Sequence, residues 1–399
     1  MALLRQTLQP LVNYAFHTQT AKIIFRKPGV RQLYAAATLG LDNFLSQRDR
    51  VKAQLANVAP KFKEKMTEYT ADDSKNMVFT EDLKNMLHLA ETNDDVTLVI
   101  KMMKRFNQQN KQLRFGNYVF GPVIMRLFYF LNKHEEAFQC FKSTELNGLF
   151  DQMMSYQILL DLLYENQRYN DILEAFEIIK SRQIEGVKFA RNVVVLMFAA
   201  CYKLNTQQSL EIALKLWSEI NSIGHFPMRR AVTFCSGLAI NQGKPEIGLE
   251  ILSGAKNANY TTIRNLKVVA LVDLGRIDDA LAVLKSILQE DGARMGPIHT
   301  FNMDVIGKLK NAVKERNNAD LSLEFDRLEK YFKDHGHISN TLLNDQLCTE
   351  IAPPQSVRNN ANEFSRQQYR TPYDDSRRNP NYRRRTNGGP ARPGLSEMH

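Results

Sequence analysis

A pattern of apolar residues repeats with a period of 35 residues in the first half of the chain. The run from Val123 to Phe128 is matched 35 residues later by the run from Ile158 to Leu163. Self-similarity at this period is typical of solenoids of helical hairpins, in which each hairpin buries its apolar face against the next. Such a fold offers a long surface and no central pocket. The pattern therefore predicts a binding protein rather than an enzyme.

Short polar turns divide each repeat into two predicted helices. In the clearest turn, Gly275 can end one helix in the left-handed conformation, and Asp278 and Asp279 favour the start of the next helix through its dipole. Similar turns lie at residues 91–101, 132–138, 166–172, 206–213 and 241–247. We expect an all-α solenoid of about seven helical pairs between residues 78 and 333. The better pairs are predicted to start near residues 117, 153, 190, 229, 261 and 298. A last helix over residues 337–348 is predicted to cap the stack.

The excess positive charge lies at the two ends of the chain. The formal net charge is +10, yet residues 42–354 contain equal numbers of basic and acidic residues. Residues 1–41 are basic, free of acids and mildly apolar, which predicts a mitochondrial transit peptide; a basic N-terminus without a targeting role is the alternative. We expect a linker or N-terminal cap at 42–77, the repeat array at 78–350 and a disordered Arg- and Tyr-rich tail at 351–399.

The residue patterns of most enzymes and metal sites do not occur in the chain. The four cysteines, Cys140, Cys201, Cys235 and Cys348, form no Cys-x-x-Cys pair and are expected to be free thiols packed in the core. His335 and His337 have no evident third ligand, so we expect no metal and no cofactor. Phosphate loops and nucleophile elbows are absent, and the longest apolar run, residues 193–201, is too short to span a membrane.

Residues at the helix starts and turns are shared with one repeat family. They are Ser155-Tyr156-Gln157, Thr300-Phe301-Asn302, Gly275-Arg276, Asp279-Ala280 and Glu136-Ala137. Together they resemble the pentatricopeptide repeat, in which Thr-Tyr-Asn opens the first helix and a Gly-Arg turn precedes the second. Further segments narrow the resemblance to a mitochondrial member of this family in animals: residues 120–127, 201–205, 229–231 and 238–242. The resemblance covers residues 80–350. It implies a protein of the mitochondrial matrix that binds RNA and supports maturation of transcripts needed for the respiratory chain.

In this family, the residue after the helix-opening Tyr hydrogen-bonds an unstacked base. The resemblance places that position at Pro122, Gln157, Val194, Thr233, Asn265 and Asn302. Only four of these can read a base edge, and they are the candidate base-reading residues: Gln157, Thr233, Asn265 and Asn302. An ordinary role at the start of a helix is the alternative for each. The second residue of each family pair does not match, which favours binding to single-stranded RNA by stacking and charge, with weak sequence preference.

Basic residues form a second set of candidates, for contacts to phosphate. On predicted first helices they are Arg191, Arg229, Arg230, Arg264 and Lys267, with a mixed solvated surface as the alternative. In the tail they are Arg377, Arg378, Arg383, Arg384 and Arg385, interleaved with tyrosines that can stack on bases; a tail that only adds solubility is the alternative. Two functions stay open: an RNA-binding factor for transcript processing or stability, and a protein–protein scaffold on the mitochondrial ribosome or the RNA-processing machinery. The oligomeric state is left open.

Overall fold

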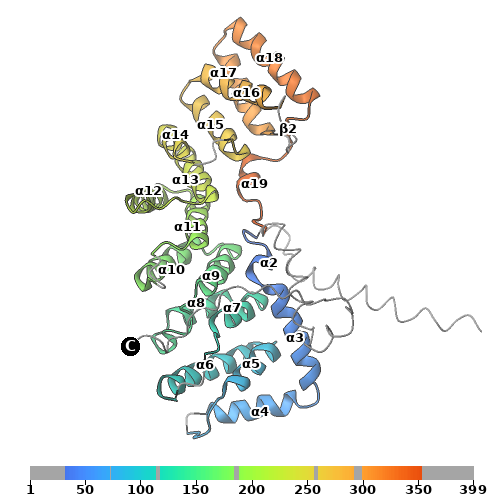
Figure 1. Cartoon of the computed structure of the whole chain (residues 1–399), viewed down its shortest axis with the longest axis vertical. Coiled ribbons are helices and arrows are strands. Elements are labelled where there is room, and N and C mark those ends of the chain that lie inside the picture. The colour runs from blue at the N-terminus through green and yellow to red at the C-terminus, as the bar shows by residue number, and fades with distance from the viewer. Residues whose placement is uncertain are drawn as a thin grey trace, which may run out of the picture. The chain divides into compact units, whose positions relative to one another are not determined.

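The computed structural model describes residues 32–71, 73–113, 117–183, 188–255, 259–291 and 299–352. Over these ranges the protein is helical apart from two strands of two residues each and one isolated bridge (Figure 1). The predicted all-α helical-repeat solenoid is confirmed. The basic residues predicted for the tail lie outside the described residues, as do residues 1–31 of the predicted transit peptide.

In the part of the chain that the structure describes, seven helical pairs make up the repeat array. Their bounds are α5 (Thr80–Leu89) with α6 (Asn93–Leu113), α7 (Gly121–Phe130) with α8 (His134–Lys142), α9 (Met153–Glu165) with α10 (Tyr169–Arg182), α11 (Arg191–Leu204) with α12 (Gln207–Ser222), α13 (Arg229–Asn241) with α14 (Pro245–Ser253), α15 (Thr261–Asp273) with α16 (Ile277–Asp291), and α17 (Met303–Glu315) with α18 (Ala319–Asp334). The short 3-10 helix η1 (Thr144–Leu146) follows α8. The first helices of four pairs begin within one residue of the predicted starts at 153, 190, 229 and 261.

The turn inside most pairs is built on a residue in the left-handed conformation. Six of the seven described pairs have one, with φ between 47° and 71°: Asn132, Gln167, Asn205, Gly243, Gly275 and Asn317. At Gly275 the Arg276 N–H then reaches back to the Leu271 carbonyl at 2.8 Å, which closes the end of α15. Left-handed backbone costs most side chains about 1–2 kcal/mol, which explains why Gly and Asn recur at this place.

The first helices form a buried layer, and the second helices cover it on one side. α13 packs against α11 and α15 within its layer and against α12 and α14 from the other layer. Every residue of α13 from Ala231 to Ile240 is buried, whereas α12 buries a single stripe around Leu210 and Leu216. The continuous apolar runs in the sequence therefore mark first helices, which have neighbours on almost every side.

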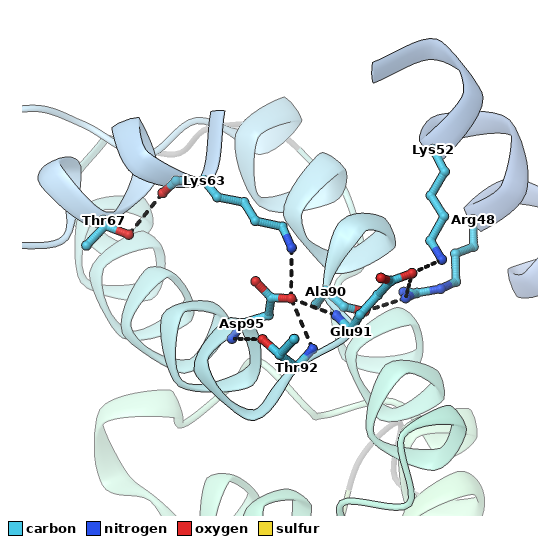
Figure 2. Close-up of polar contacts among 8 residues, drawn as sticks. All are labelled: Arg48, Lys52, Lys63, Thr67, Ala90, Glu91, Thr92 and Asp95. Atoms are coloured by element: carbon cyan, nitrogen blue, oxygen red, sulfur yellow. Dashed lines mark hydrogen bonds and ion pairs between the residues drawn. The ribbon is translucent and has the colours of Figure 1, made fainter. Parts of the chain in front are cut away.

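Within the described residues, three further helices precede the array: α2 (Ala36–Leu39), α3 (Leu41–Leu55) and α4 (Ala59–Tyr69). α3 packs on α5 and α7, and α4 packs on α5 and α6. Polar contacts from α4 meet the turn between α5 and α6, where Thr92 and Asp95 cap α6 (Figure 2). The Lys63 ammonium lies 2.8 Å from the Asp95 carboxylate. Burial opposes ionisation of Asp95, but Lys63 and the N–H groups of Glu91 and Thr92 hold its pKa below the usual value.

Helix α3 contributes a buried arginine to the same turn. Arg48 is 1% exposed and donates a hydrogen bond to the Ala90 carbonyl at the end of α5 (Figure 2). Its guanidinium also lies 3.7 Å from the Glu91 carboxylate and 4.8 Å from the centre of the Phe130 ring on α7. Burial, which outweighs the nearby carboxylates, lowers the pKa of Arg48. Residues 42–55 are thus joined to the first two pairs by packing and by charge.

The chain after α18 differs from the sequence prediction. The expected helix over residues 337–348 is wrong: Ile338–Ser339 form strand β2, and the helix that follows within the described residues, α19 (Leu343–Leu347), has five residues. Strand β2 pairs in parallel with β1 (Phe301–Asn302), so α17 begins at Met303, after the predicted start near 298. α19 packs on α13 and α15 rather than on the end of the stack.

Candidate functional site

The four candidate base-reading residues all lie within or directly before first helices, and all are buried. Thr233 and Asn265 are fully buried, Asn302 is 1% exposed and Gln157 is 4% exposed. In the structure, their side chains therefore contact protein rather than solvent.

Hydrogen bonds of Gln157, Asn265 and Asn302 link neighbouring pairs, whereas Thr233 donates to the Arg230 carbonyl of its own helix. The Asn192 amide at the start of α11 donates to Gln157 Oε1 on α9 at 2.8 Å. Asn265 on α15 donates to the Thr300 carbonyl at 3.1 Å and accepts from the Asn302 N–H at 2.9 Å. The Gln157 Nε2 and Asn302 Oδ1 atoms have no hydrogen-bond partner among the described residues. These bonds thus hold successive first helices together, and the two atoms named above stay without a hydrogen-bond partner among the described residues.

Residues 337–352, here called the strap, run along the first helices on the side away from the second helices. In Figure 1, α19 lies on one side of α11 and α13, and α10, α12 and α14 lie on the other. The strap begins with the β1–β2 pairing and with the Asn302 amide donating to the Thr341 carbonyl at 2.8 Å. The Leu343 N–H then donates to Asp304 Oδ2 on α17 at 3.0 Å. We call the surface formed by α9, α11, α13, α15 and α17 beneath and beside the strap the first-helix face.

Arg230 on α13 binds the middle of the strap. Its guanidinium donates to the carbonyls of Gln346 at 3.3 Å, Leu347 at 2.6 Å and Thr349 at 2.6 Å. On α11, the Tyr202 hydroxyl donates to Asn344 Oδ1 at 3.1 Å. Burial, ahead of the charge of the neighbouring Arg229, lowers the pKa of Arg230, although nearby tyrosines partly offset it.

The end of the strap meets the beginning of the described chain. The Ile351 N–H donates to the Leu33 carbonyl at 2.8 Å, and Tyr34 and Ile351 form an isolated parallel bridge. Asp161 on α9 fixes this junction, since it accepts from the Tyr34 N–H at 3.2 Å and from the Tyr129 hydroxyl at 3.0 Å. Asp161 is fully buried, and burial raises its pKa well above the usual value. Sequence reasoning missed both Asp161 and the strap, because neither belongs to a recognisable motif.

The candidate phosphate-binding residues fall into several environments. Arg191 is exposed at the start of α11, and Arg229 is exposed at the start of α13 with its guanidinium 3.6 Å from the centre of the Tyr260 ring. Arg230 is half-buried under the strap, Lys267 is half-buried, and Arg264 is 4% exposed. Arg377, Arg378, Arg383, Arg384 and Arg385 lie outside the described residues. Arg191 and Arg229 are therefore the two candidates on described first helices whose side chains reach solvent most fully.

Cysteine and histidine side chains are common sources of catalytic nucleophiles and metal ligands. No group of three or more His, Cys, Asp or Glu side chains that could hold a metal ion occurs in the described part of the chain. All four cysteines are free and buried, and burial raises the pKa of Cys140 and of Cys201 to about 12. His335 and His337 contact the backbone carbonyls of Tyr331 and His299. No described helix combines the length and the apolar character needed to cross a membrane.

Comparison with known proteins identifies the repeat class. The chain is 29% identical over 272 residues to pentatricopeptide repeat-containing protein 2, mitochondrial, of Homo sapiens, and the match covers 68% of this chain and 69% of the relative. The protein of the same name from Danio rerio is 30% identical over 281 residues, which is 69% of this chain and 71% of the relative. The chain belongs to the pentatricopeptide repeat-containing protein 2 family. No family model matches it.

Membership of this family agrees with the array of helical pairs. The pentatricopeptide resemblance drawn from the repeat residues is confirmed, and the names of these relatives state that they are mitochondrial. The feature that the repeat pattern did not indicate is the strap, which covers part of the first-helix face with the chain's own C-terminal segment.

Proposed function

We propose that the protein binds single-stranded RNA in the mitochondrial matrix and supports the maturation, processing or stability of transcripts needed for the respiratory chain. The observation that carries the proposal is a row of first helices, packed side by side in a pentatricopeptide-type array, with exposed arginines at the starts of α11 and α13. Arginine binds phosphate through paired N–H groups, and a row of helices gives an extended chain a continuous surface. No catalytic step is part of the proposal.

The proposed binding is mainly electrostatic. The four candidate base-reading side chains are buried and bonded within the chain. They therefore contribute little to base selection unless the first-helix face rearranges to expose them. Arg191 and Arg229, together with the arginines of the tail, supply the proposed phosphate contacts. Leu33 and Tyr34 are buried in the core, and we therefore place the end of a cleaved presequence before them.

Filter binding of the full chain to single-stranded RNA over a salt series tests the proposal. Affinity should fall with salt, and the slope of log K against log salt should shrink by about 0.7 for each phosphate contact removed. Arg191→Ala and Arg229→Ala should each reduce the slope. The matched control is Arg327→Ala, an exposed arginine on the second helix α18, which should leave it unchanged. Absence of salt-dependent binding by the unmodified chain would refute the proposal.

A protein–protein scaffold is the second candidate, with RNA-processing or ribosomal proteins as partners. The specific observation in its favour is that three of the four positions predicted to read bases, Gln157, Asn265 and Asn302, instead bond one pair to the next. A scaffold needs a rigid array but no exposed base-reading groups. Binding of RNA with measurable sequence preference by the array would count against this candidate.

A further inference from the structure

We propose that the strap occupies the place of RNA on the first-helix face, and that single-stranded RNA must displace the strap to bind there. The inference rests on the proposed RNA-binding function and adds to it a site and a means of control. The site comprises Tyr202 on α11, Arg230 on α13 and Asn302 before α17, all of which contact the strap.

The bonds from Arg230 to the strap resemble those of an arginine to phosphate. Three carbonyl oxygens of the strap, at residues 346, 347 and 349, converge on one guanidinium. A phosphate group presents several oxygens to the same planar set of N–H donors, with a full negative charge in addition. Exchange of strap for RNA would therefore replace three neutral acceptors with a charged one.

The other two contacts also match what single-stranded RNA needs. The Asn302 amide donates to a backbone carbonyl of the strap, and its Oδ1 atom has no partner among the described residues. An amide side chain can donate a hydrogen bond to a base edge through its NH2 group and accept one through its oxygen. Tyr202 adds an aromatic ring, on which a base can stack. A cation, an amide and an aromatic group thus lie on neighbouring parts of one face.

Only three of the sixteen residues of the strap, His337, Leu347 and Cys348, are buried, which favours its local opening. Within it, Leu347 and Cys348 are buried in the core, whereas Leu342 is 50% exposed. A cavity of about 260 Å³ lies between the strap and the first helices, with Tyr202, Asn241 and Lys308 in its wall. Segments with few buried contacts open at lower free energy than the core.

The experiment compares RNA affinity in two matched variants of the full chain. Leu347→Ser removes the buried anchor of the strap, and Leu342→Ser changes an exposed leucine of the same segment. With a mixed-sequence single-stranded RNA, Leu347→Ser should bind about tenfold more tightly than the unmodified chain, because closure of the strap no longer reduces the competent fraction. Leu342→Ser should bind as the unmodified chain does.

Hydrogen exchange on the unmodified chain gives a second measurement that needs no variant. On addition of RNA, the amides of Leu343 and Ile351 should exchange faster, since their acceptors outside the strap, the Asp304 carboxylate and the Leu33 carbonyl, are lost. RNA binding of equal strength in all three proteins, with these amides still protected in the complex, would overturn the displacement and leave the proposed function intact. Absence of binding in all three would overturn both.

Discussion

Substitution of Arg230 by alanine should loosen the strap without unfolding the array. Arg230 gives two hydrogen bonds of 2.6 Å and one of 3.3 Å to carbonyls of the strap. A hydrogen bond from a charged donor contributes about 1.5–3 kcal/mol. Because Arg230 is half-buried and the longest bond is weak, we expect a total of about 2–3 kcal/mol in favour of strap closure. That free energy corresponds to an opening equilibrium about 30- to 140-fold larger in the variant.

Native-state hydrogen exchange measures this opening directly. The Ile351 amide, which bonds the Leu33 carbonyl, and the Cys348 amide, which bonds the Asn344 carbonyl, should exchange faster by that factor in Arg230→Ala. The matched control is Arg229→Ala, which removes the adjacent exposed arginine stacked on Tyr260. Unchanged exchange in Arg230→Ala, or equal acceleration in both variants, would refute the assignment of Arg230 as the residue that holds the strap.

Three further predictions concern stability, measured by urea unfolding. Gly275→Ala should lower the free energy of unfolding by about 1–2 kcal/mol, because φ at this residue is +69°. Gly254 has φ −75°, so Gly254→Ala should change the free energy of unfolding little. Burial, then the charges of Arg48 and Lys84, lowers the pKa of His88 from 6.5 to about 4, so its stabilising effect is complete above pH 6.5 and falls by about 3 kcal/mol as the pH drops to 4; His88→Gln should remove this dependence. Arg48→Ala should lower the free energy of unfolding by about 3 kcal/mol through lost packing and an unpaired Ala90 carbonyl. Lys52 pairs with the same Glu91 carboxylate as Arg48 but is partly exposed, so Lys52→Ala should cost less than about 1 kcal/mol.

The repeat architecture could be predicted from the sequence because its determinants are local. A buried first helix needs a continuous apolar run, and a tight turn needs Gly or Asn in the left-handed conformation, as at Gly275 and Asn205. Both signals recur at the repeat period. Packing of a pair depends mainly on its neighbours in the array, so the local pattern was enough to place most pairs.

The environment of the candidate site could not be predicted in the same way. Asn265 and Asn302 look like ordinary polar residues at helix starts, and their partners lie in the next pair or in the strap. Residues 343–347 have leucines four apart, which is a helical spacing, and they do form α19. The predicted helix does not reach back to residue 337, because Ile338 and Ser339 pair with β1 instead. Contacts of this range, more than 100 residues apart for Arg230, leave no periodic trace in a sequence.

Crosslinking of RNA to the protein in intact mitochondria, followed by sequencing of the bound RNA, tests the proposed function most directly. RNA-binding through charge and stacking predicts enrichment of single-stranded segments of mitochondrial transcripts, with a weak consensus and with loss of signal when Arg191 and Arg229 are both replaced by alanine. Recovery of no more RNA than from an uncrosslinked control would contradict the proposal and would favour the protein–protein scaffold.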